Sequence, residues 1–290
     1  MAIQLLETKK IWNQLSLNDE EIVIMKKIGF IGIGLMGFPM AKNILKAGHS
    51  LSAFNRSKKK AEKLIKFGAN ISDNIKNLVS DRDIIITMLS DDLAVDEIMN
   101  STDFIDNIRP EAIVIDMSSI KPTTAIKHGG NLKLKNIDYL DAPVSGGTVG
   151  AEEASLAIMV GGKQNIFNKA YDVLKIMGNP TLVGPLGSGQ VSKLANQIIV
   201  GLTIGAVAEA ITLCEKAGAN PVKMVTALSG GWADSKILQT HGKRMIDKNF
   251  DPKGKKKFTK YCEAWWDHKK DGCLGVDFVN KLESKNVGRS

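Results

Sequence analysis

Short apolar runs alternate with longer amphipathic stretches over most of the chain. Runs rich in Ile, Val and Leu predict buried strands at 28–33, 50–54, 84–89, 112–116, 137–141, 155–160 and 181–183. Helical periodicity between some of these runs predicts helices at about 36–47 and 165–177. Strands that alternate with helices build a parallel sheet covered on both faces, so the sequence predicts a doubly wound α/β domain.

A longer apolar stretch follows this domain and predicts one long helix. Apolar residues continue after Gly189 until Gly218 and Pro221 end the pattern. We expect most of this helix to be buried, because it is apolar on nearly every side. Its most apolar window, 198–213, contains Glu209 and is too short to span a bilayer. The acidic N-terminal segment does not resemble a signal peptide, so we expect a soluble, cytoplasmic protein without a membrane partner.

The composition limits the classes of protein further. With 290 residues, 43% of them hydrophobic, the chain has room for two domains. Its net charge of +8 is concentrated in lysines at 253–270, so we expect no nucleic-acid partner. The three cysteines form no Cys-x-x-Cys pair and no cluster with His, which predicts a reducing compartment and no metal site.

A glycine pattern after the first predicted strand indicates a dinucleotide site. Gly32, Gly34 and Gly37 form Gly-x-Gly-x-x-Gly between strand and helix, with Leu35 and Met36 inside it. The first glycine permits a tight turn, the second lets a pyrophosphate approach the backbone, and the third lets helix and strand pack closely. The alternative is a glycine-rich turn without a ligand. Because the glycine pattern lies at the start of a β–α unit, it favours the binding of NAD or NADP over a turn without a ligand. We expect all five residues of the pattern named here to contact the dinucleotide.

The end of the second predicted strand indicates which dinucleotide is preferred. An acid at this position would bind the ribose 2′-hydroxyl of NAD, but the chain has Asn55, Arg56 and Ser57, followed by three lysines. Arg56 can form a bidentate pair with a 2′-phosphate. We therefore predict that these residues bind NADP in preference to NAD. The alternative is that Arg56 is a solvated loop charge.

Lys193 lies in the first turns of the long predicted helix and is the candidate catalytic residue. Partial burial would lower its pKa from about 10.4 toward roughly 7–8, where an ammonium can donate a proton to a developing alkoxide. Asn196 and Gln197, three and four residues later, share its face of the helix. Most lysines on such helices instead extend their alkyl chain along an apolar surface and have no chemical role.

The carboxyl ends of the predicted strands carry small and polar residues. Open parallel sheets bind ligands at this edge. Ser145, Gly146 and Gly147 follow one strand and offer a hydroxyl and accessible backbone N–H groups, which suit a small carboxylate. The alternative is an ordinary turn, in which Ser-Gly-Gly is also common.

Four motifs, in order and spacing, resemble the signatures of the β-hydroxyacid dehydrogenase family. They lie at 28–49, 116–120, 141–162 and 187–197, and the resemblance extends over about 27–252. It implies a Rossmann-type dinucleotide-binding domain at 26–187, an interdomain helix with an all-α domain at 188–252, and a homo-oligomer whose partner subunit covers part of the helix. Residues 1–25 are then an extension outside the fold, and 253–290 an atypical basic tail.

The resemblance also implies roles for individual residues. Lys193 is similar to the catalytic lysine, and Ser145, Gly146 and Gly147 to the substrate-binding loop, with Asn196 and Gln197 beside them. Further cofactor contacts are implied next to the nicotinamide and in the tail, at Met88, Leu89, Ser119 and Lys260.

The activity implied is the reduction of a small aldehyde acid to a hydroxy acid with NADPH or NADH. Residues 193–200 and 116–119 resemble members that reduce tartronate semialdehyde to glycerate. Residues 55–57 instead resemble members that reduce glyoxylate or succinic semialdehyde with NADPH, and a 3-hydroxyisobutyrate dehydrogenase is a further alternative. Outside the enzymes, the alternative is a dinucleotide-binding protein that no longer turns over.

The chain departs from the family in three places. Gln197 stands where many members have Asn, and Leu89-Ser90-Asp91 where members commonly have Leu-Pro-Asn. Beyond Pro252 no helical period is sustained, and Tyr261 replaces the acid expected beside Lys260. We hypothesise that a frameshift or a truncated reading of the gene replaced the native tail, which would leave the cleft open to water.

Overall fold

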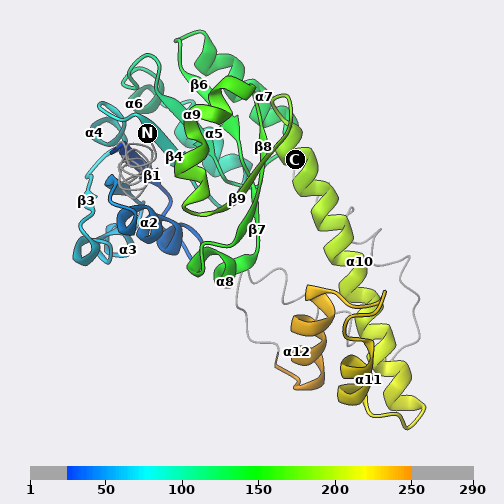
Figure 1. Cartoon of the computed structure of the whole chain (residues 1–290). Helices are drawn as coiled ribbons and strands as arrows, with labels where there is room; N and C mark the ends of the chain where they lie inside the picture. The colour runs from blue at the N-terminus through cyan, green and yellow to red at the C-terminus, as the bar shows by residue number, and fades with distance from the viewer. Residues whose placement is uncertain (1–24, 250–290) are drawn as a thin grey trace, which may run out of the picture.

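A single long helix leads away from a domain built on a β-sheet. The structure, a computed structural model, describes residues 25–249. Figure 1 shows the sheet and its helices in one body, with α10 (Ser188–Lys216) extending from it and α11 (Pro221–Leu228) and α12 (Lys243–Ile246) beside the distal half of α10. The predictions for the extension before Met25 and for the tail after Pro252 lie outside the described residues.

The sheet has nine strands among the described residues, in the order β3-β2-β1-β4-β5-β6-β8-β7, and β9 pairs with β8. The neighbours from β3 to β6 are parallel, β6 and β7 pair antiparallel with β8, and β9 runs parallel to β8. The carboxyl ends of the parallel strands therefore meet at one edge. The strands are β1 (Lys27–Ile31), β2 (Ser50–Phe54), β3 (Asn70–Ile71), β4 (Ile84–Thr87), β5 (Ile113–Asp116), β6 (Asp138–Asp141), β7 (Val144–Ser145), β8 (Leu156–Gly161) and β9 (Gly178–Gly184).

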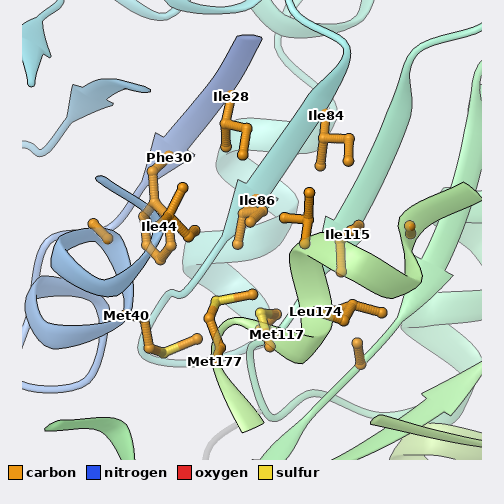
Figure 2. Packing of buried hydrophobic residues seen from close by; sticks show 14 of the residues in the cluster. Ile28, Phe30, Met40, Ile44, Ile84, Ile86, Ile115, Met117, Leu174 and Met177 are labelled. Carbon is orange, nitrogen blue, oxygen red and sulfur yellow. The ribbon is translucent and has the colours of Figure 1, made fainter. Parts of the chain in front are cut away.

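Helices cover both faces of the sheet, because successive side chains of a strand point to opposite sides. Ile84 and Ile86 pack in one core with Met40 and Leu174, as Figure 2 shows, whereas Ile85 belongs to a second core. The remaining helical elements are α2 (Gly37–Lys46), α3 (Lys58–Glu62), η1 (Ile65–Phe67), α4 (Ile75–Val79), α5 (Asp92–Met99), α6 (Thr102–Ile105), α7 (Pro122–Lys133), α8 (Gly147–Glu152), α9 (Gln164–Lys175) and the π-helical turn η2 (Leu238–Gly242).

The predicted doubly wound α/β class is confirmed, and most strands lie where the apolar runs placed them. The run at 181–183 is part of the longer β9. Two short strands, β3 and β7, have no apolar run of their own. β3 is held by pairing with β2, and β7 by antiparallel pairing with β8, so tertiary partners rather than local sequence define them.

The long helix α10 is less buried than its apolar composition predicted. Its distal half packs Ile204, Val207 and Ile211 against Leu238 and Met245, in a third core. Several of its large apolar side chains are more than half exposed, namely Val191, Leu194, Ile198, Ile199, Leu202 and Leu213. The expectation of a largely buried helix is therefore wrong for the described chain, because η2, α11 and α12 pack against its distal half and leave these side chains uncovered.

The length of α10 also corrects the expectation that its apolar segment is too short for a bilayer. The helix has 29 residues, and an 18-residue window reaches a mean hydropathy of 1.8, so length and composition alone would allow it to cross a membrane. A single helix of this kind is a weak indication, since core helices of soluble proteins meet the same criterion.

A buried carboxylic acid ends strand β5. Asp116 accepts hydrogen bonds from Thr87 Oγ1 at 2.8 Å and from Ser118 N at 3.0 Å. Removal from water raises the pKa of Asp116 from 3.8 to about 6; the nearby Asp141 carboxyl also raises it, and the hydrogen bonds oppose the shift. The folded protein therefore keeps this proton at pH values where the unfolded chain releases it.

We predict that Asp116→Asn changes how folding stability depends on pH. Because the folded pKa exceeds the unfolded one, Asp116 favours folding most below about pH 4, and this advantage is lost as the pH rises through about 6. A shift of this size corresponds to about 3 kcal/mol.

Chemical denaturation at pH values between about 4 and 7 tests this prediction. The free energy of unfolding of Asp116→Asn, minus that of the wild type, should increase with pH. Glu97→Gln, at an exposed position of α5, serves as the control and should show no such increase. A constant difference between Asp116→Asn and the wild type would contradict the prediction.

Candidate functional site

The glycine loop between β1 and α2 has the shape that a dinucleotide pyrophosphate requires. Gly32 has φ +102°, and a Cβ there would overlap Met88 O. A Cβ on Gly34 would meet no atom within 4 Å, so the space beside this backbone is open. At Gly37 a Cβ would overlap Gly32 O, because α2 begins directly against the loop. The loop fits the group, with Leu35 exposed at its tip.

Asn55 connects the end of β2 to this loop. Its Oδ1 accepts a hydrogen bond from Ile33 N at 2.9 Å, and its Nδ2 donates to Ser57 O at 3.0 Å. Both ends of the amide therefore have partners within the chain, and Asn55 holds the loop and the following turn together. Arg56 and Ser57 are exposed at the same edge. The structure thus leaves Arg56, rather than Asn55, with its side chain directed to solvent.

The loops after β4 and β5 are joined by a buried serine. Leu89 N donates a hydrogen bond to Ser118 Oγ at 2.9 Å. Ser118 is fully buried, whereas Ser119 is exposed at the sheet edge, and Met88 is half-buried. Three residues predicted to lie beside the nicotinamide, Met88, Leu89 and Ser119, are thus brought to neighbouring loops of the edge that carries the glycine loop.

Lys193 reaches the segment that contains Ser145. Its Nζ donates a hydrogen bond to Val144 O at 2.8 Å, and the side chain is partly buried. Ser145 follows in β7 and is half-buried, and the exposed Gly146 and Gly147 have φ values of 140° and 64°, which favour glycine. The structure therefore brings the predicted proton donor to the predicted substrate loop, although they are far apart in the sequence.

The two amides after Lys193 lie against each other on α10. Asn196 Nδ2 donates to Gln197 Oε1 at 3.0 Å, and Asn196 is half-buried while Gln197 is exposed. Lys260, the remaining predicted cofactor contact, lies outside the described residues. Within residues 25–249, no group of three or more His, Cys, Asp or Glu side chains is placed to hold a metal ion.

Sequence reasoning missed the buried polar residues that hold the start of α10. Asp141 accepts hydrogen bonds from Gly187 N and Gln190 N, both at 2.8 Å. Burial raises the pKa of Asp141, and these backbone hydrogen bonds oppose the shift. Gln190 is itself buried and contacts the loop after β5. The sequence does show a polar residue at the end of a buried strand and another at the start of an apolar helix. Neither pattern indicates which groups these residues hydrogen-bond to.

Two known families match the chain. Residues 27–192 match the NAD binding domain of 6-phosphogluconate dehydrogenase. Residues 187–259 match the NAD-binding domain of NADP-dependent 3-hydroxyisobutyrate dehydrogenase, so the match extends past Pro252, where the sequence resemblance was expected to end.

Individual proteins are similar over most of their length. The 2-hydroxy-3-oxopropionate reductase of Escherichia coli K12 is 43% identical over 232 residues, which are 78% of this chain and 78% of that protein. The 2-(hydroxymethyl)glutarate dehydrogenase of Eubacterium barkeri is 38% identical over 200 residues, 68% of this chain and 66% of that protein. The solved structure of Mycobacterium tuberculosis 3-hydroxyisobutyrate dehydrogenase with L-serine has a TM-score of 0.75 and 28% identity, over 87% of this chain and 90% of that one.

The glycine loop, the sheet and these matches define an NAD(P)-dependent oxidoreductase that acts on CH–OH groups. The chain belongs to the 3-hydroxyisobutyrate dehydrogenase-like family of β-hydroxyacid dehydrogenases. The family predicted from the four motifs is thus confirmed, and so is the use of a nicotinamide dinucleotide.

Proposed function

We propose that this enzyme reduces a small aldehyde acid to a hydroxy acid, with tartronate semialdehyde (2-hydroxy-3-oxopropanoate) to glycerate as the favoured reaction and Lys193 as the general acid. The observation that carries this proposal is the 2.8 Å hydrogen bond from Lys193 Nζ to Val144 O, one residue before Ser145. It holds the amine beside a loop whose hydroxyl and backbone N–H groups suit a carboxylate.

The residues divide the chemistry among them. When bound, the reduced dinucleotide supplies the hydride that reaches the carbonyl carbon. Lys193 Nζ donates its proton to the carbonyl oxygen, and its charge stabilises the alkoxide that develops there. The Ser145 hydroxyl and the N–H groups of Gly146 and Gly147 bind the carboxylate and orient the carbonyl. Asn196 and Gln197 orient the lysine or a substrate hydroxyl.

The choice of substrate rests on similarity to the Escherichia coli 2-hydroxy-3-oxopropionate reductase at 43% identity. The alternatives are the aldehydes of the other family activities, since pocket size decides among molecules that differ by one or two carbons. Initial rates with tartronate, methylmalonate and succinic semialdehydes and with glyoxylate, each with NADPH and NADH, test the choice. A higher kcat/KM for any other aldehyde would refute the preference for tartronate semialdehyde, and no turnover of any of them would refute the proposed function.

We predict that Lys193→Ala lowers kcat by a factor of roughly 10² to 10⁴, the usual contribution of general acid catalysis. Dinucleotide affinity should change little, because the glycine loop lies at the end of β1, away from α10. Steady-state kinetics and a fluorescence titration with NADPH measure the two quantities. Lys216→Ala, at an exposed position in the last turn of the same helix, is the matched control. A Lys193→Ala variant with more than about a tenth of wild-type kcat would refute the assigned role.

NADPH is proposed as the preferred dinucleotide, because Arg56 is exposed at the ribose end of the site and no acid stands there. We predict that Arg56→Ala raises the KM for NADPH by roughly ten- to a hundredfold and leaves the KM for NADH nearly unchanged. The factor is the affinity that a charge-assisted hydrogen-bonded pair with a phosphate contributes. Lys59→Ala, exposed in α3, should change neither constant strongly. Equal losses with both dinucleotides would show that Arg56 does not bind the 2′-phosphate.

We also propose that the enzyme is cytoplasmic. The exposed apolar side of α10 is proposed as a surface through which two copies of the chain associate. Leu194, Ile198, Ile199 and Leu202 are each more than half exposed, a larger apolar surface than scattered single residues provide. A partner subunit that covers this face removes it from water, as a symmetric contact between two copies would.

We predict that the protein is a dimer or larger oligomer and that Leu202→Glu weakens the association. A carboxylate placed in an apolar contact loses its water, which opposes binding. Sedimentation velocity over a concentration series measures the change. The control is Leu93→Glu, at a residue 80% exposed on α5. A wild-type protein that remains monomeric at all concentrations would contradict the prediction.

A further inference from the structure

Gln190 is a polar side chain enclosed between three elements of the active-site edge. It is 1% exposed, and both ends of its amide have a partner: Oε1 accepts from Ile120 N at 3.1 Å, and Nε2 donates to Ser118 O at 2.9 Å. Its backbone N donates to the Asp141 carboxylate at 2.8 Å. One residue therefore connects the loop after β5, the end of β6 and the first turn of α10.

The Ser118 end of this connection continues to the loop after β4. Ser118 accepts the Gln190 amide at its backbone oxygen and the Leu89 N–H at its hydroxyl oxygen. A single buried residue thus receives hydrogen bonds from both sides. Ser118 thereby links Gln190 to the loops that contain Leu89 and Ser119.

The other end of the connection leads to Lys193. Asp141 holds the first amides of α10, Gly187 N and Gln190 N, at 2.8 Å. Gln190 lies three residues before Lys193, less than one helical turn, and an α-helix transmits its position rigidly over that distance. The Lys193 ammonium then rests on Val144 O.

We propose that Gln190 is a positioning residue that sets Lys193 in register with the loops after β4 and β5. The inference rests on the proposed function, because that function places the proton donor at Lys193 and the nicotinamide beside Leu89 and Ser119. Proton and hydride must reach adjacent atoms of one carbonyl, so the spacing between these two groups of residues governs the rate. At 1% exposure Gln190 has no surface to offer a reactant, so it acts through its contacts.

Gln190→Met removes the two side-chain hydrogen bonds, to Ile120 N and Ser118 O, with little change in volume, and keeps the backbone bond to Asp141. Ser118 O and Ile120 N then lose their partners in the interior, and the loop and helix separate to regain hydrogen bonds. We expect kcat, calculated from the concentration of protein that binds the dinucleotide, to fall by up to about a hundredfold. The change in KM should be smaller. The solvent deuterium isotope effect on kcat should increase, since proton transfer from a displaced lysine becomes slower. Gln164→Met, at an exposed position of α9, is the matched control.

Gln190→Glu supplies a variant that can restore the missing contact. A protonated glutamic acid can donate to Ser118 O and accept from Ile120 N, as glutamine does, whereas the carboxylate cannot donate. The kcat of Gln190→Glu, divided by that of Gln190→Met, should therefore rise as the pH is lowered from about 8 to about 6, because burial raises the pKa of such a carboxyl. The other ionisable groups around this position, Asp141, Asp116 and Lys193, are present in both variants, so a pH dependence found in Gln190→Glu and not in Gln190→Met is due to the introduced carboxyl.

A second readout does not depend on turnover. The folded protein is treated with an amine-acylating reagent and then digested, and mass spectrometry of the Lys193 peptide gives the rate of its modification. This rate should increase about fivefold in Gln190→Met, the factor that corresponds to one lost hydrogen bond. Unchanged acylation and a kcat within about twofold of Gln164→Met would overturn the positioning role. Faster acylation of Lys193 in Gln190→Met, together with a Lys193→Ala variant that keeps wild-type kcat, would support the link between Gln190 and Lys193 and would refute the role of Lys193 as general acid.

Discussion

The rest of the site depends on hydrogen bonds that a buried carboxylate accepts from the start of a helix. Asp141 lies at the end of β6, and its oxygens accept the N–H groups of Gly187 and Gln190, which have no partner inside α10. The negative charge also lies at the positive end of the helix dipole. A Cβ on Gly189 would overlap Met159 O, so the helix approaches the sheet as closely as the backbone allows. This contact decides where the Lys193 side chain can reach.

Parallel pairing brings the other parts of the site to the same edge. The glycine loop, the Asn55 turn, the Leu89 loop and the Ser118 loop follow β1, β2, β4 and β5, whose carboxyl ends align because the strands are parallel. Partly buried hydrogen bonds then link neighbouring loops, from the glycine loop to Asn55 and from Leu89 to Ser118. The edge behaves as one connected polar layer above an apolar sheet, and its members constrain one another.

The helix that carries Lys193 combines two environments. Its first turn is bonded into the sheet edge, and its distal half contributes Ile204, Val207 and Ile211 to a separate core with Leu238 and Met245. Between them, the side that bears Ile198 and Leu202 faces solvent in the described chain. The proposed proton donor, Lys193, thus lies on the same helix as an uncovered apolar surface. Under the proposed mechanism, a partner that covers this surface would strengthen the charge interactions of the site by excluding water.

The sequence by itself determined the elements whose signals are local. Buried strands show as apolar runs, the glycine loop shows through backbone geometries that only glycine permits, and the start of α10 marks Lys193 as a lysine within an apolar helix. Only the tertiary structure decided that Lys193 rests on Val144 O, that Asn55 binds the glycine loop, and that Asp141 and Gln190 hold α10 in place. It also decided that one side of α10 is exposed, where the pattern predicted burial. The physical reason is that periodicity records the preference of each side chain for water or for the interior, whereas a hydrogen-bond partner or a covering surface comes from residues distant in sequence, which the pattern does not identify.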